Sequence, residues 1–177
     1  MPTTLPIAYL NGRYLPIGEA RISPLDRGFL FADAVYEVIA VYGGRPLGLD
    51  AHLARLARGL GEIGMANPHT DAGWRNILGE LVHRNRHGAT DMGLYLQISR
   101  GADNGRDKAF PHGLAPTVFA MASPLAPADP ETAGVRAITG PDTRWARCDI
   151  KTTALLANVL LYETARRAGA GEYIMLR

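Results

Sequence analysis

The sequence predicts an α+β fold, and two kinds of pattern support this class. Two apolar runs, "IAYLNGRYLP" (7–16) and "AVYEVIAVYGGRPLGL" (34–49), are interrupted by Asn11-Gly12 and Gly43-Gly44. Such pairs favour the two-residue turns of antiparallel hairpins. Residues 53–63 and 74–82 instead place apolar side chains at spacings of three and four, which indicates amphipathic helices. Hairpin strands followed by separate helices are typical of the α+β class.

The boundaries of these elements follow from residues that favour turns and caps. Asp50 is expected to cap the first helix, and the second helix is expected to run from about Ala72 to His87-Gly88. Two buried strands, "MGLYLQISR" (92–100) and "PTVFAMA" (116–122), are joined by a polar, glycine-containing loop. Beyond them we expect a strand at "GVRAIT" (134–139), a helix after Lys151 and a strand at "EYIML" (172–176).

The chain is expected to contain one domain and part of another. Residues 1–125 hold enough strands and helices for a small N-terminal domain. Residues 126–133 are rich in proline and alanine, which is typical of a linker. Residues 134–177 supply one strand, one helix and a further apolar strand, so we expect them to begin a larger domain that is incomplete.

Composition excludes several classes of function. The net charge is +2 and no run of five or more like charges occurs, so nucleic acid is not an expected partner. A single cysteine, Cys148, excludes an internal disulfide, is expected to be a buried neutral thiol, and fits a cytoplasmic protein. No apolar run is long enough for a membrane span, and the N-terminus lacks the pattern of a signal peptide. No metal is expected, because His83 and His87 lie in "HRNRH" without a metal-site pattern.

Lysine is rare in this chain, and its placement is informative. Seventeen of the nineteen Lys and Arg residues are arginine; the two lysines are Lys108 and Lys151. Lys151 lies between Ile150 and a leucine-rich segment, and desolvation of this kind favours the deprotonated amine that covalent chemistry requires. A solvated lysine before a helix has the same local sequence, so composition alone leaves both interpretations open.

Several blocks of the chain resemble the D-amino acid aminotransferases. These blocks are "DRGFLFADAVYEVIAVYGG", "HLARL", "SRGADNGRDKAFP" and "RWARCDIKTTALLANVL", of which "RCDIK" is the most specific to the D-amino acid branch. The resemblance implies the fold-type IV architecture of pyridoxal-phosphate (PLP) enzymes, with a small N-terminal α/β domain and the start of a larger C-terminal one. It implies ping-pong transamination between D-amino acids and 2-oxo acids, and a homodimer in which one loop reaches into the partner's site.

The resemblance also assigns roles to individual residues. Lys151 would hold PLP as an internal aldimine and then move a proton, and Arg55 would bind the cofactor phosphate. Tyr36 would help to hold the substrate carboxylate, together with Arg106 of the "NGRDKAFP" loop. Lys108 stands in this loop where the family has a histidine, so the carboxylate site is expected to have an altered geometry.

Each of these residues also has a simpler interpretation. Arg55 could be a surface arginine of an amphipathic helix, Tyr36 a packed strand residue, and the two loop residues solvated charges. Glu37 alternates with Tyr36 and is expected to point to the other face of the strand in a structural role.

The resemblance further implies residues that lie beyond position 177. In the family, the strand that begins at "EYIML" leads to a glutamate that pairs with the pyridine nitrogen of PLP, and to further phosphate ligands. We therefore expect these 177 residues to be an incomplete fragment that is inactive alone. The alternatives are an aminodeoxychorismate lyase, which uses the same lysine to release pyruvate, and a non-catalytic fragment that retains a dimer surface.

Overall fold

The computed structural model describes residues 4–89, 91–125 and 134–177, and these divide into two compact units. The first unit contains the described residues up to Leu125 together with Ile150–Thr153. The second contains residues 134–149 and Ala154–Arg177. The segment predicted to be a linker, residues 126–133, lies outside the described residues. None of the described helices has the length and apolar character needed to cross a membrane.

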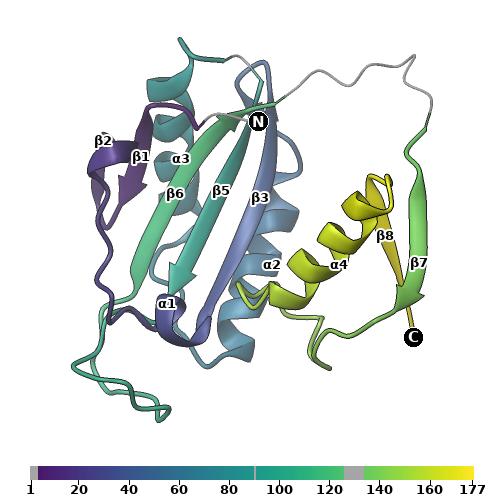
Figure 1. The fold of residues 1–177 in the computed structure, drawn as a ribbon. Coiled ribbons are helices and arrows are strands. Elements are labelled where there is room, and N and C mark those ends of the chain that lie inside the picture. The colour runs from purple at the N-terminus through teal and green to yellow at the C-terminus, as the bar shows by residue number, and fades with distance from the viewer. Residues whose placement is uncertain (1–3, 90, 126–133) are drawn as a thin grey trace. The chain divides into compact units, whose positions relative to one another are not determined.

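The first unit is built on a six-stranded antiparallel sheet (Figure 1). Its strands follow the order β2-β1-β6-β5-β3-β4. Their bounds are β1 (Ile7–Leu10), β2 (Arg13–Pro16), β3 (Ala34–Tyr42), β4 (Arg45–Pro46), β5 (Met92–Ser99) and β6 (Thr117–Pro124). The short helices η1 (Ile17–Glu19) and α1 (Arg27–Phe31) connect β2 to β3. β3, β5 and β6 are the longest strands of the sheet.

Both predicted hairpins are present. β1 pairs with β2 around Asn11 and Gly12, whose φ angles are 47° and 90°. β3 pairs with β4 around Gly43 and Gly44, whose φ angles are 53° and 79°. Turns with two positive φ angles match the right-handed twist of the strands that they join, and asparagine and glycine tolerate these angles. The turn chemistry therefore determined these two connections locally.

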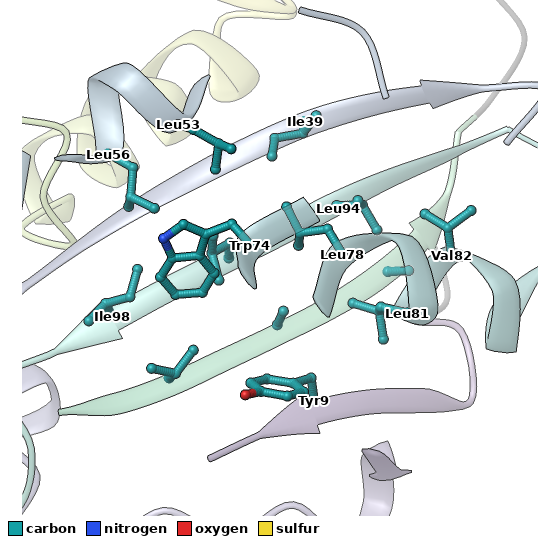
Figure 2. Packing of buried hydrophobic residues seen from close by; sticks show 14 of the residues in the cluster. Tyr9, Ile39, Leu53, Leu56, Trp74, Leu78, Leu81, Val82, Leu94 and Ile98 are labelled. Carbon is teal, nitrogen blue, oxygen red and sulfur yellow. The ribbon is translucent and has the colours of Figure 1, made fainter. Parts of the chain in front are cut away.

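Two helices cover one face of the sheet: α2 (Leu49–Glu62) and α3 (Asp71–Asn85) (Figure 1). Their apolar stripes pack against alternate residues of the strands, and Trp74 lies in the middle of this core with no exposed surface (Figure 2). The prediction of Asp50 as the cap of α2 is wrong. Gly48 occupies that position with φ of 60°, because Leu49 already packs on the core and starts the helix earlier. Thr70 caps α3 by accepting a hydrogen bond from the amide of Gly73.

The second unit consists of β7 (Ala137–Pro141), α4 (Leu156–Arg167) and β8 (Glu172–Leu176). β7 and β8 are parallel neighbours, and α4 packs against β8. The strand predicted at 134–139 begins three residues later than expected. Asp142 follows β7 and accepts hydrogen bonds from Arg144 and Arg177, which ties the end of β8 to the end of β7.

Candidate active site

The segment that carries Lys151 lies along β3. The amide of Tyr36 donates a hydrogen bond of 3.0 Å to the carbonyl of Lys151, and the amide of Thr153 donates one of 3.2 Å to the carbonyl of Ala34. β4 pairs only with Val41 and Tyr42, so the rest of this side of β3 is left without a neighbouring strand from the sheet. An unpaired edge offers backbone donors and acceptors to any extended segment. The lysine is thereby placed at the sheet edge by backbone hydrogen bonds.

The side chain of Lys151 lies over Tyr36. Its Nζ atom is 4.2 Å from the centroid of the Tyr36 ring, and the lysine is partly exposed. Within the described part of the chain, no carboxylate lies within ion-pair distance of this amine. The amine is therefore held by an aromatic ring and stays accessible to a small molecule.

Tyr36 belongs to a row of aromatic residues on the sheet face opposite the helices. Its ring stacks on that of Tyr95 at 5.6 Å, and Phe119 lies 6.5 Å beyond Tyr95. The Tyr95 hydroxyl donates a hydrogen bond of 2.7 Å to Oε1 of Gln97. Burial, with a smaller contribution from Tyr36, raises the pKa of Tyr95 to about 12. Tyr95 therefore stays neutral at physiological pH and supports the Tyr36 ring without adding charge to the site.

On the helix-covered face, Glu37 binds two residues of α2. Its carboxylate accepts hydrogen bonds of 2.7 Å from Nε and 2.6 Å from Nη2 of Arg55, and its Oε2 lies 2.8 Å from Nδ1 of His52. His52 and Arg55 are three residues apart, so they project from one side of the helix. Glu37 is 1% exposed, whereas the side chain of Arg55 is 44% exposed. The buried carboxylate thus orients a guanidinium whose outer part faces solvent.

The charges of this cluster are mutually stabilising. Burial raises the pKa of Glu37, but hydrogen bonds from Arg55 and His52 outweigh it and leave the pKa below its ordinary value of 4.5. Hydrogen bonding to Glu37 raises the pKa of Arg55, and Tyr36 adds a smaller increase in the same direction. Tyr36, the neighbour of Glu37 on β3, contacts Lys151 through its ring. β3 thus carries both Tyr36, which contacts Lys151, and Glu37, which binds Arg55.

Replacing Glu37 by glutamine is expected to lower the free energy of unfolding at pH 7 by about 1 kcal/mol, since solvent weakens a pair with a half-exposed arginine. The folded pKa of Glu37 is depressed, so its contribution is complete above the unfolded value of 4.5 and is lost as pH falls below it. The variant should therefore show a flatter decline of stability below about pH 4.5. Urea unfolding at a series of pH values measures this decline.

The matched control for Glu37→Gln is Glu80→Gln. Glu80 pairs with Arg84 on the surface of α3, where both side chains are more than 40% exposed. This substitution should change the free energy of unfolding by less than about 0.5 kcal/mol. An acid profile for Glu37→Gln that runs parallel to that of the unmodified protein would contradict the assignment.

Arg106 and Lys108 lie apart from this cluster. Both are exposed residues of the irregular connection between β5 and β6. The Arg106 guanidinium lies 5.1 Å from the ring of Phe31. Among the described residues, neither loop side chain makes a hydrogen bond, an ion pair or a ring contact with Lys151 or Tyr36. Within the described ranges, the structure therefore brings Lys151 into contact with Tyr36 and pairs Arg55 with Glu37, and it shows no contact of the two loop residues with Lys151 or Tyr36.

Three residues gain importance only from the structure: Glu37, His52 and Tyr95. In the sequence, the spacing of His52 and Arg55 was the one sign that these two residues bind a common partner, because residues three apart on a helix project from the same side. The expectation of a buried thiol at Cys148 is wrong: it is half-buried, and Sγ donates to the carbonyl of Trp145 at 3.0 Å. No group of three or more potential metal ligands exists in the described part of the chain.

Comparison with known proteins shows the family to which the chain belongs. Residues 34–177 match the family model of class IV aminotransferases. The chain belongs to this family. The α+β class and the fold-type IV architecture are confirmed.

Individual relatives narrow the similarity. A D-alanine aminotransferase of Bacillus licheniformis is 42% identical over 168 residues, which is 94% of this chain and 58% of that protein. One of Staphylococcus haemolyticus is 35% identical over 171 residues, 96% of this chain and 60% of that protein. The resemblance to D-amino acid aminotransferases is thus confirmed. The chain spans about three fifths of the length of these relatives.

Solved structures share the fold. A hypothetical aminotransferase from Mycobacterium tuberculosis in its PLP-bound form superposes with a TM-score of 0.78 at 26% identity, over 96% of this chain and 61% of that one. The branched-chain amino acid aminotransferase from Escherichia coli superposes with a TM-score of 0.82 at 19% identity, over 97% of this chain and 58% of that one. The second comparison supports the fold alone.

Proposed function

We propose that this chain acts in a PLP-dependent aminotransferase that exchanges amino groups between D-amino acids and 2-oxo acids. The observation that carries the proposal is the contact between Lys151 and Tyr36 at the β3 edge. There the accessible amine of Lys151 lies 4.2 Å from the Tyr36 ring, in a chain that is 42% identical to a D-alanine aminotransferase. We also propose that residues 1–125 are the small domain of this fold, 126–133 its linker, and 134–177 part of the cofactor domain.

The residues present fit the cofactor. PLP has an aldehyde, which needs an uncharged primary amine, and a phosphate, which needs cationic donors. Lys151 supplies the amine. Arg55 supplies the cation: Glu37 occupies its Nε and Nη2 donors, while its Nη1 donates to none of the described residues. Lys151 would therefore hold the cofactor covalently and Arg55 would bind its phosphate. When bound, PLP supplies the electron sink for the carbanion.

The protein's own groups would then bind the substrate and move the proton. An incoming amine would release Nζ of Lys151. The free amine could then take the proton from the substrate α-carbon and return it to another atom during the transfer. The Tyr36 hydroxyl would donate a hydrogen bond to the substrate carboxylate; the contact of its ring with Lys151 supports this role. Lysine fits this exchange because its amine deprotonates when desolvated, which a guanidinium does not.

Arg106 and Lys108 are proposed to add positive charge at the substrate carboxylate. Both are exposed and lie away from Lys151 of their own chain, which supports a role in the site of a second copy. A homodimer is therefore part of the proposal, and sedimentation equilibrium of the purified protein measures it. Lys108 is a longer donor with a permanent charge at neutral pH, in contrast to histidine, so the preferred carboxylate position should differ.

Amino-group transfer with each enantiomer of alanine tests the function in the whole protein that carries this chain. With PLP and 2-oxoglutarate present, D-alanine should give pyruvate, and L-alanine should give far less. Omitting 2-oxoglutarate should limit pyruvate to about one molecule per PLP, because the cofactor then has no acceptor to which it can pass the amino group. Pyruvate release over many turnovers without 2-oxoglutarate, in excess of the PLP present, or a preference for L-alanine, would overturn the proposal.

A further inference from the structure

Arg27 is a buried arginine that binds the backbone of an exposed loop. We call residues 103–110 the Arg106 loop. The side chain of Arg27 is 3% exposed, and its Nη1 and Nη2 donate hydrogen bonds of 2.6 Å and 3.3 Å to the carbonyls of Asp107 and Lys108. Its Nε donates one of 2.8 Å to Oδ2 of Asp33. A buried guanidinium is costly unless its donors are satisfied, so these carbonyls are held where Arg27 needs them.

A second arginine holds the far end of the same loop. The guanidinium of Arg100 lies 3.8 Å from the centroid of the Phe110 ring and donates hydrogen bonds of 2.7 Å and 3.0 Å to the carboxylate of Asp33. Burial raises the pKa of Asp33, but hydrogen bonds from Arg100 and Arg27 outweigh this effect and lower the pKa below its usual value. Asp33 therefore stays ionised and joins the two arginines.

The loop's remaining contacts are mostly local. The amides of Asn104 and Ala109 donate to the side chains of Asp103 and Asp107, which are within the loop itself. Among the described residues, the one further backbone tie is the amide of Asp103, which donates to the carbonyl of Leu25 at 3.3 Å. The two arginines thus provide most of the contacts that fix the loop against the rest of the unit.

The ring of Phe31 lies beside both Arg27 and Arg106. The Cζ atoms of Arg27 and Arg106 lie 4.9 Å and 5.1 Å from the centroid of the Phe31 ring. The Arg106 loop is therefore contacted by the first residue of α1, Arg27, and by the last, Phe31. The loop backbone and the Arg106 guanidinium are held by one short helix.

The same stretch of chain also holds the segment of Lys151. Immediately after α1, the carbonyls of Ala32 and Ala34 accept hydrogen bonds from Thr153, and the amide of Tyr36 donates to the carbonyl of Lys151. Residues 27–36 thus contact both the segment with the amine and the loop with the two cationic side chains. A shift of Arg27 would move the loop relative to this common support.

We propose that Arg27 is a positioning residue for the substrate carboxylate: it fixes the carbonyls of Asp107 and Lys108, so that Arg106 and Lys108 are presented in one geometry. That a substrate carboxylate binds here rests on the proposed function. That Arg27 anchors the loop rests on the hydrogen bonds described above. An arginine that served only the core would not place two donors on consecutive carbonyls of exposed residues. A loop ordered in advance binds a carboxylate without the entropic cost of ordering it.

Limited proteolysis measures the anchoring. Trypsin cleaves after arginine and lysine, and the Arg106 loop contains one of each. Arg27→Lys keeps the charge, loses the forked donors and adds no new tryptic site. Cleavage after Arg106 and Lys108 should become about tenfold faster or more, which corresponds to the loss of hydrogen bonds from a charged donor. Cleavage after Arg75 and Arg84 in α3 should not change.

The control and a second variant keep this test decisive. Arg84→Lys on α3 removes a guanidinium from a surface pair and should leave loop cleavage unchanged. If Arg27→Lys fails to fold, Phe31→Leu decides, since Phe31 is only partly buried and its loss removes the ring beside Arg27 and Arg106. Loop cleavage at the unmodified rate in the folded variant would overturn the inference.

Steady-state kinetics of the PLP-loaded protein test the link to substrate. In Arg27→Lys, KM for D-alanine should rise about tenfold while kcat changes less than about twofold, as expected when carboxylate binding is lost and the reacting groups are untouched. Faster loop cleavage with an unchanged KM would overturn the carboxylate role. If the whole protein that carries this chain shows no transamination, the proposed function fails, and the cleavage rates still decide whether Arg27 anchors the loop.

Discussion

Replacing Lys151 by arginine should abolish covalent PLP binding and reduce amino-group transfer by at least about 10²- to 10⁴-fold, the range expected for loss of a general acid–base group alone. The guanidinium does not deprotonate near neutral pH, so it can neither attach the cofactor nor carry the substrate proton. The yellow absorbance band of lysine-bound PLP should be lost. Borohydride reduction followed by peptide mass spectrometry measures attachment directly.

The composition of the chain supplies a matched control for this experiment. Lys108 is the other of its two lysines, so Lys108→Arg leaves Lys151 as the sole lysine. This variant should retain the absorbance band and the full extent of reductive labelling, with any change confined to substrate preference. Labelling at Lys108 in the unmodified protein, or an intact band in Lys151→Arg, would contradict the assignment of Lys151.

Replacing Arg55 by lysine should weaken PLP binding by about 10- to 100-fold, the factor expected for loss of charge-assisted hydrogen bonds to a phosphate. The charge is kept, but a lysine cannot bind Glu37 through two parallel hydrogen bonds and still direct a further donor outward. In the structure Arg55 achieves both, because Nε and Nη2 face Glu37 and Nη1 does not. Fluorescence titration with PLP measures the dissociation constant.

Two comparisons isolate the effect of Arg55. Arg84→Lys changes an exposed arginine in another ion pair and should leave PLP affinity unchanged. Glu37→Gln retains the Arg55 guanidinium but weakens the contact that orients it, so its loss of affinity should be smaller than that of Arg55→Lys. If Arg55→Lys binds PLP within about twofold of the unmodified protein, Arg55 is not the phosphate ligand.

Most of the fold could be predicted because its signals are local. The turns at Asn11-Gly12 and Gly43-Gly44 need positive φ angles that these residues tolerate, so the two hairpins are encoded within a few residues each. The apolar stripes of α2 and α3 follow from helical periodicity alone. The one error of capping, at Asp50, arose because packing of Leu49 on the core decides where α2 begins.

The site was only partly accessible from the sequence. Lys151 and Arg55 were predicted through their resemblance to a family, since a lone lysine or arginine has no local pattern that reveals its chemistry. The structure adds the hydrogen-bond partners that hold the side chains in place. Glu37 lies 18 residues before Arg55, and Arg27 lies about 80 residues before the carbonyls that it binds.

The sequence by itself therefore determined most of the helices and strands of this protein and its membership of an aminotransferase family, and it predicts Lys151 as the lysine that holds PLP. Only the tertiary structure showed that the Lys151 segment pairs with the free edge of β3, that Glu37 orients Arg55, and that Arg27 holds the Arg106 loop. The physical reason is the range of the interactions. Turns and helical stripes depend on neighbouring residues, whereas a buried charge finds its partners only when distant segments pack together.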